Sequence, residues 1–197
     1  MRIGVFGGSF DPIHNGHAIL ANFTSQCGIV DEVWLMVSRK NPLKDKETQA
    51  SEIQRLEMAE MVAMECKNVK ISDFEMTMPS PSFTIDTLNA LKEKYPEHQF
   101  VWIIGSDSLK NFSNWKNSEE IKNKYGLIVY PRPGYPLIGR EPDGMTYLNG
   151  APEFSISSTL IREYVADGWN INYFVPLKVG RYISKNNLYK NGNESTL

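Results

Sequence analysis

The chain has 197 residues, an apolar fraction of 41% and a charged fraction of 22%. These are ordinary values for one globular domain, and they exclude a disordered chain, a collagen-like fibre and a coiled coil. Its 21 Lys and Arg against 23 Asp and Glu give a net charge of −2, which excludes a protein that holds nucleic acid through a broad basic face but leaves a small anionic ligand open.

The first half of the chain alternates short apolar runs with amphipathic segments. The opening run, residues 2–6, stops at two glycines, which is typical of a buried strand that ends in a turn. Asp11 and Pro12 then favour an N-cap followed by the first helical residue. In chain order we expect a strand at 2–6, a helix at 12–26, a strand at 32–37, a polar loop at 38–49, a helix at 51–66, a strand at 69–72, and a helix carrying Ile85, Leu88 and Leu91.

The second half continues the alternation. We expect strands at 100–104 and 127–130, a short strand at 145–148 among the loops of 131–152, and helices at 118–124, 158–167 and 176–184. Strands that alternate with helices indicate βαβ units, so the sequence predicts a Rossmann-like, doubly wound α/β fold whose mostly parallel sheet carries helices on both faces. No repeat or linker divides the chain, which predicts a single domain over 1–189 and a polar tail over 190–197.

Cysteine use and hydropathy favour a cytoplasmic protein. Cys27 and Cys66 form no CxxC pair, so we expect two reduced, buried thiols. No basic and apolar leader opens the chain, and the apolar runs are far shorter than the ~18 residues that a membrane span needs.

The stretch from Gly7 to His17 holds the densest functional signal, and it follows the first strand. Paired glycines let backbone N–H groups approach a phosphate, and the next helix presents its positive end. His14 and His17 lie three residues apart on a helix start, so both rings can donate Nε–H bonds to one anion, with Gly16 leaving room between them. Ligands of such sheets bind beyond the carboxyl ends of the strands, so we expect the loops 7–17, 38–44, 105–115 and 131–134 to converge there.

Other phosphate or metal sites fit this stretch poorly. A P-loop needs GxxxxGK before Ser or Thr, and the dinucleotide fingerprint needs GxGxxG; neither pattern occurs here. A zinc site needs a third ligand and usually HExxH spacing. An N-capped helix with two incidental histidines is the structural alternative that stays open.

Two motifs in the expected order carry a family resemblance. The stretch GSFDPIHNGH resembles the H-x-G-H signature of the nucleotidylyltransferase superfamily, which is related in fold to class I aminoacyl-tRNA synthetases. Near the C-terminus, ISSTLIR matches the superfamily's S-T-x-x-R element at a helix start. Within the superfamily the chain, from residue 2 to about 189, looks like the bacterial nicotinate-nucleotide adenylyltransferases. The stretches that support this closer resemblance are 41–44, 81–88, 105–108 followed by Trp115, and 132–134.

The resemblance implies a reaction between ATP and nicotinate mononucleotide. The 5′-phosphate of the mononucleotide attacks the α-phosphorus of ATP, giving deamido-NAD and pyrophosphate. That nucleophile is already anionic, so catalysis rests on positioning and charge stabilisation. By this resemblance the catalytic residues are His14, His17 and Arg162. Mg²⁺ is expected with ATP, held mainly by phosphates and water rather than by a protein metal site.

The resemblance also implies how ATP is bound. Ser158 and Thr159 would donate to the β- and γ-phosphates, Lys44 would reach the phosphates, and Asp107 would accept from the ribose hydroxyls. The full set of expected ATP-binding residues is Gly7, Gly8, Ser9, Phe10, His14, His17, Lys44, Asp107, Ile156, Ser158, Thr159 and Arg162.

For the second substrate, the resemblance implies contacts from Ser9, Lys44, Thr84 and Trp115. Trp115 would stack on the pyridine ring, and Thr84 with nearby backbone N–H groups would meet the carboxylate. No Arg or Lys is obvious at the helix start near 82–84. Many relatives carry an aromatic residue after the tryptophan, whereas this chain has Lys116. The expected partners are the two substrates, with no nucleic acid and no membrane; a homo-oligomer stays open.

Several alternatives stay open. In the alternative interpretation, Trp115 only packs against its neighbours, Arg162 forms a surface ion pair and Lys44 is a solvated charge. Asp107 and Ser158 would then be N-caps. At the level of function, the acceptor could be nicotinamide mononucleotide or phosphopantetheine, although pantetheine-phosphate adenylyltransferases are usually shorter and lack the 81–88 segment. A non-catalytic nucleotide-binding regulator predicts damaged motifs, and both motifs are intact. A synthetase-like RNA-binding protein needs an appended domain and a basic surface, which neither the length nor the net charge of −2 allows.

Overall fold

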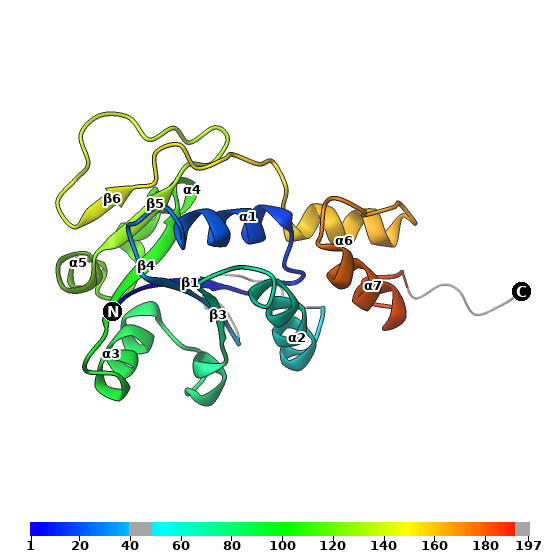
Figure 1. Ribbon diagram of the computed structural model, residues 1–197, viewed down its shortest axis with the longest axis horizontal. Coiled ribbons are helices and arrows are strands. Elements are labelled where there is room, and N and C mark those ends of the chain that lie inside the picture. Colours follow the sequence, from blue (N-terminus) through cyan, green and yellow to red (C-terminus); the bar gives the residue numbers. More distant parts are fainter. Residues whose placement is uncertain (40–48, 192–197) are drawn as a thin grey trace, which may run out of the picture.

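The apolar run after Met1 forms strand β1 (Arg2–Gly8). In the computed structural model, which describes residues 1–39 and 49–191, all other strands of the sheet run parallel to β1 (Figure 1). The strand order is β3-β2-β1-β4-β5-β6. This is the doubly wound order, in which the strands are added towards one edge of the sheet as far as β3 and towards the other edge from β4 onwards. This confirms the predicted fold class. The other strands are β2 (Glu32–Val37), β3 (Val69–Ser72), β4 (Gln99–Gly105), β5 (Leu127–Tyr130) and β6 (Met145–Tyr147).

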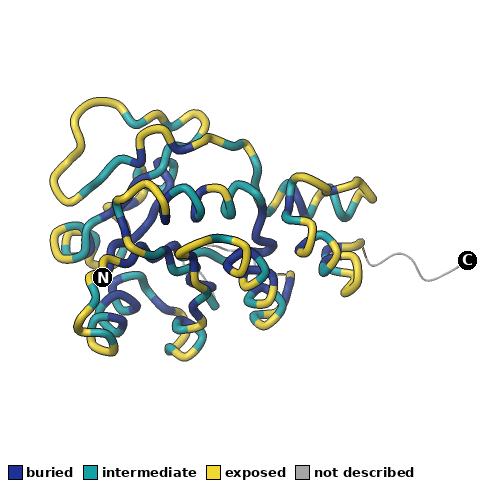
Figure 2. Tube along the Cα trace, in the orientation of Figure 1, coloured by how far each residue is buried: buried dark blue, intermediate teal, exposed yellow. Residues whose placement is uncertain are grey.

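Two apolar clusters cover the two faces of the sheet. Side chains alternate across a strand, so Val33 and Leu35 join one cluster while Met36 joins the other. The first cluster includes residues of α1, α2, α6 and α7, and the second includes residues of α3 (Figure 2 shows the buried centre). The helices are α1 (Asn15–Thr24), α2 (Glu52–Ala63), α3 (Thr84–Lys94), α4 (Ser106–Leu109), α5 (Ser118–Glu120), α6 (Ser158–Ala166) and α7 (Leu177–Lys185). Short turns of 3₁₀ helix lie at Phe74–Thr77 and Phe112–Asn114, and a π-helical turn lies at Ile121–Tyr125.

The start of the first helix corrects the sequence prediction. Helix α1 begins at Asn15 with His14 as its N-cap, so Asp11 is not the cap and Pro12 is not the first helical residue. Phe10 adopts a left-handed backbone conformation (φ 46°) with its ring buried. The chain therefore turns once more before the helix begins.

Smaller corrections concern helix ends and the thiols. Helix α2 stops at Ala63 instead of residue 66, and the helix expected at 118–124 is α-helical only to Glu120 before the π-helical turn. Both cysteines are free, but neither is buried: Cys27 is exposed and Cys66 is partly exposed. Across residues 1–39 and 49–191, no helix combines the length and apolar character needed to cross a bilayer.

Candidate active site

A pocket opens at the carboxyl ends of β1 and β4, where the strand order reverses. Its volume is about 310 Å³, which is enough for part of a nucleotide-sized ligand. Strand order and pocket therefore agree on the place that the doubly wound fold reserves for ligands. Residues that line it include Gly7, Gly8, Ser9, Phe10, His17, Glu75, Ser82, Phe83, Thr84, Gly105, Ser108, Asn114, Trp115, Lys116, Tyr130 and Ser158.

The glycine turn after β1 forms one wall of the pocket. A Cβ on Gly7 would lie 2.4 Å from the Trp102 indole, and one on Gly8 would lie 3.0 Å from the Phe10 ring. Gly7 has no room for a side chain, and at Gly8 the Phe10 ring would have to shift. The turn thus presents bare backbone to the pocket, which is what close approach to a phosphate requires.

The two motif histidines form a reciprocal cap at the start of α1. The His17 backbone N–H donates to His14 Nδ1, and the His14 backbone N–H donates to His17 Nδ1, each at 3.3 Å. The rings stack with centroids 3.6 Å apart. Because each Nδ1 accepts, the proton of each neutral ring is on Nε2, which becomes a donor. The sequence predicted such donors, but not the cap that fixes them.

Only His17 of the pair lines the pocket; His14 is 3% exposed and stacks behind it. Burial, together with the positive charge of Arg132, lowers the pKa of His14 to about 4. His14 is therefore neutral at pH 7.

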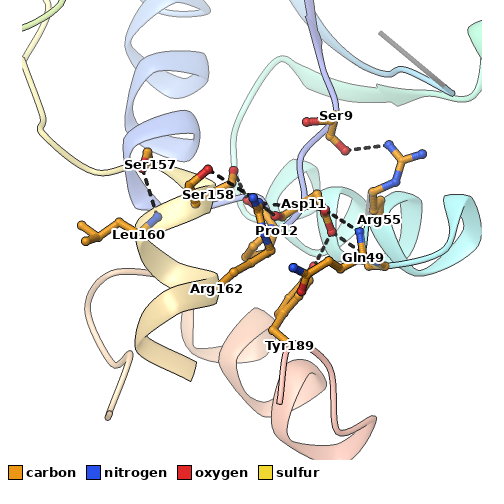
Figure 3. A network of polar contacts seen from close by, with 12 residues as sticks. Ser9, Asp11, Pro12, Gln49, Arg55, Ser157, Ser158, Leu160, Arg162 and Tyr189 are labelled. Atoms are coloured by element: carbon orange, nitrogen blue, oxygen red, sulfur yellow. Dashed lines mark hydrogen bonds and ion pairs between the residues drawn. The ribbon is translucent and has the colours of Figure 1, made fainter. Parts of the chain in front are cut away.

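A buried carboxylate organises the loop between β1 and α1 (Figure 3). Asp11 accepts from the backbone N–H groups of Gln49 (2.9 Å) and Ala50 (3.1 Å) and from the Tyr189 hydroxyl (2.8 Å). Arg162 donates through Nη1 to the Asp11 carbonyl at 2.6 Å, and its Nη1 lies 4.0 Å from the Asp11 carboxylate. Sequence reasoning missed this role of Asp11, because its partners lie 38 to 178 residues away.

The start of α6 meets the same loop. Ser157, not Ser158, caps α6 by accepting from the Leu160 N–H at 3.2 Å, so the N-cap alternative for Ser158 is wrong. The Ser158 hydroxyl instead donates to the Pro12 carbonyl at 2.9 Å and lines the pocket (Figure 3). The two sequence motifs are thus in direct contact.

Arg55 is a second residue that sequence reasoning missed. Its side chain is 0% exposed and donates through Nη1 to the carbonyls of Ser9 (2.7 Å) and Ser38 (2.6 Å). It therefore ties the glycine turn to the end of β2. The signal was present, since Arg55 precedes the buried Met58 and Ala59 by three and four residues and so lies on the buried face of α2.

The far end of the pocket contains the two residues expected around the pyridine ring of the second substrate, Thr84 and Trp115. Thr84 is the first residue of α3, and Trp115 packs against Phe112 with centroids 5.4 Å apart. Lys116 also lines this end, so a cation that was not obvious from the sequence lies here. Glu75 lines it too; the Thr87 hydroxyl donates to its carboxylate at 2.9 Å, and burial raises its pKa.

Other expected residues lie beside the pocket lining rather than in it. Asp107 does not cap α4, whose N-cap is Gly105, so its N-cap alternative is wrong; it faces Arg132, with Nε and Oδ2 3.8 Å apart. Ile156 packs against the core, and Thr159 accepts from Arg162 Nη2 at 3.1 Å. Lys44 lies outside the described residues.

The sequence is similar to a known protein family and to named relatives. The Cytidylyltransferase-like family matches residues 5–164. The chain is 40% identical to the "Probable nicotinate-nucleotide adenylyltransferase" of Flavobacterium johnsoniae over 96% of this chain and 100% of that protein. It is 35% identical to the nicotinate-nucleotide adenylyltransferase of Bacillus subtilis over 96% of this chain and 98% of that protein.

The chain belongs to the nicotinate-nucleotide adenylyltransferase family. Its fold is shared with a solved structure of the Plasmodium falciparum nicotinic acid mononucleotide adenylyltransferase complexed with NaAD. The TM-score is 0.78 at 22% identity, covering 95% of this chain and 97% of that one.

Proposed function

We propose that this chain transfers the adenylyl group of ATP to nicotinate mononucleotide, releasing pyrophosphate and forming deamido-NAD for NAD biosynthesis. Membership of the nicotinate-nucleotide adenylyltransferase family supports the reaction. The observation that carries the proposal is the shape of the pocket: one cavity joins the glycine turn and His17 to Thr84 and Trp115. A reaction that joins two nucleotides needs both to lie in one continuous space.

The phosphate end of the pocket supports the bond-forming step. An oxygen of the acceptor phosphate attacks the α-phosphorus of ATP as the bond from that phosphorus to the pyrophosphate oxygen breaks. The Nε2–H of His17 donates to the α-phosphate, where charge gathers, and the backbone from Gly7 to Ser9 holds the phosphates. His14 acts beside it by keeping His17 in place through the cap and the stack. A side-chain base is unnecessary, because the attacking phosphate is already ionised.

Further ATP contacts come from the start of α6 and from Asp107 in α4. In the proposal Ser158, Thr159 and the backbone near Ile156 bind the β- and γ-phosphates, and the positive end of α6 favours these anions. Arg162 adds its charge nearby while it holds the Asp11 carbonyl. In this proposal Phe10 supports the turn from below, Asp107 accepts from the ribose, and Lys44 reaches the phosphates.

At the other end, Trp115 stacks on the pyridine ring of the acceptor, and Thr84 with the first N–H groups of α3 receives its carboxylate. Ser9, which also lines the pocket, contacts the acceptor phosphate in this proposal.

Magnesium enters with ATP in this proposal. Within residues 1–39 and 49–191, no group of three or more His, Cys, Asp or Glu side chains is gathered as a metal site. An ion that is held by phosphate oxygens and water does not need such a group. When bound, Mg²⁺ neutralises charge on the phosphates.

The test is pyrophosphate release from ATP with nicotinate mononucleotide, nicotinamide mononucleotide or phosphopantetheine as acceptor. We expect the highest kcat/KM with nicotinate mononucleotide; equal or faster turnover with another acceptor would refute the substrate assignment.

His17→Ala should lower kcat about 100- to 1,000-fold with little change in KM for ATP. His98→Ala is the matched control, because His98 lies in the aromatic cluster around Trp34 rather than in the pocket lining. Normal turnover of the His17 variant would remove His17 from its role.

A further inference from the structure

A charged pair lies at the acceptor end of the pocket. The Lys116 ammonium is 2.8 Å and 3.0 Å from the two carboxylate oxygens of Asp86, in the first turn of α3. It also lies 4.9 Å from the centroid of the Phe83 ring. Lys116 and Phe83 line the pocket, whereas Asp86 does not. The pair thus holds the ammonium against the start of α3, beside Thr84.

Lys116 brings a positive charge to the pocket lining. Among the described lining residues, Lys116 is the one lysine or arginine, and Glu75 is the one carboxylate. The Glu75 carboxylate is occupied by the Thr87 hydroxyl at 2.9 Å. An anionic group on the acceptor ring therefore meets a cation here, together with the free N–H groups that begin an 11-residue helix.

We propose that Lys116 determines specificity for an acceptor whose ring carries a carboxylate, in preference to one that carries a neutral carboxamide. This inference rests on the proposed function. An ammonium has three N–H donors, so it can keep Asp86 and still bind a ligand carboxylate. A carboxamide gains little from the same charge. Asp86 is the positioning residue that keeps Lys116 at the pocket.

The experiment compares kcat/KM for nicotinate mononucleotide and nicotinamide mononucleotide in the wild-type protein and in Lys116→Met. The ratio of the two values should fall about tenfold in the variant, because one half-exposed charge-assisted contact is lost. Lys116→Arg, which keeps the charge, should recover most of the ratio. An unchanged ratio in Lys116→Met would overturn the inference.

Two further arms keep the test decisive. Lys124→Met is the matched control, since Lys124 pairs with Glu120 and Asn89 and does not line the pocket; its ratio should match the wild type. In the unaltered protein, raising salt should lower the same ratio, because salt screens a half-exposed charge. The acceptor phosphate is common to both substrates and cancels in the ratio. A salt-independent ratio would also overturn the inference, whether or not the variants fold.

The outcomes separate this inference from the proposed function. Absence of turnover with nicotinate mononucleotide in the wild-type protein would refute the function itself. A wild-type preference for nicotinate that persists in Lys116→Met would leave the function standing and remove Lys116 as its determinant.

Discussion

Replacing Tyr189 with Phe removes a single hydroxyl from the network that holds the loop between β1 and α1. That hydroxyl donates to the buried Asp11 carboxylate at 2.8 Å, and Tyr189 is only 7% exposed. Burial raises the pKa of Tyr189, as does the charge of Asp11. The phenol therefore stays protonated and remains a donor throughout the neutral range. A hydrogen bond to a charged group contributes about 1.5–3 kcal/mol to stability.

We expect Tyr189→Phe to lower the free energy of unfolding by about 2 kcal/mol, since Asp11 keeps its two backbone donors. Urea unfolding measures this as a lower midpoint with an unchanged m value. In a thermal scan, a loss of that size corresponds to a Tm lower by about 4–8 °C in a domain of this length.

Tyr173→Phe provides the control for Tyr189→Phe, because Tyr173 is 93% exposed and its hydroxyl contributes nothing that folding changes. A double-mutant cycle with Asp11→Asn isolates the pair. A Tyr189→Phe loss below about 0.5 kcal/mol, the range of neutral surface changes, would show that the network does not support the loop.

Two more predictions follow from the glycine turn and the histidine cap. Gly7→Ala should destabilise the fold by about 1–3 kcal/mol, because the new Cβ would lie 2.4 Å from Trp102. Gly180→Ala, in helix α7 with an ordinary 3.4 Å contact, should instead stabilise it by about 0.5–1 kcal/mol; a reversed order in urea melts would contradict the packing argument. Because the folded pKa of His14 is about 4, the stability due to its neutral form is complete above pH 6.5 and is lost as pH falls towards 4, about 3 kcal/mol in all. His14→Asn keeps an N-cap without this titration, so its unfolding free energy should fall less over that range; parallel pH profiles would refute the assignment.

Strands β2 and β3 could be predicted to the residue because their signals are local. β2 is a short apolar run that follows Glu32, β3 alternates apolar and polar residues, and the two predicted ranges match the observed ones. The histidine pair and the α6 start were likewise recognisable, since each is a compact pattern beside a secondary-structure boundary.

The start of α1 could not be predicted, because local and tertiary interactions compete there. Asp11 is a good N-cap residue by propensity, yet its carboxylate is occupied by Ala50 and Tyr189. His14 caps the helix instead. Nothing near Asp11 in the sequence identifies these distant partners.

Arg55 and Lys116 show two different limits of sequence reasoning. Arg55 lies on the buried face of α2, so the helical period indicated burial but not the carbonyls of Ser9 and Ser38 that it holds. Lys116 stood out only as a departure from the family pattern. Its place in the pocket depends on how the turn after Trp115 packs against α3, which no periodicity encodes.

The glycine turn after β1 is held by residues from far along the chain rather than by its own sequence. Arg55 holds the Ser9 carbonyl from α2, and Arg162 holds the Asp11 carbonyl from α6. Tyr189, beyond α7, holds the Asp11 carboxylate. These donors fix the carbonyl side of the turn, which leaves its N–H side for the ligand. The net charge of −2 is compatible with anionic substrates for this reason: the attraction comes from aligned backbone dipoles and a few placed side chains, which act over a few ångströms and do not require a basic protein.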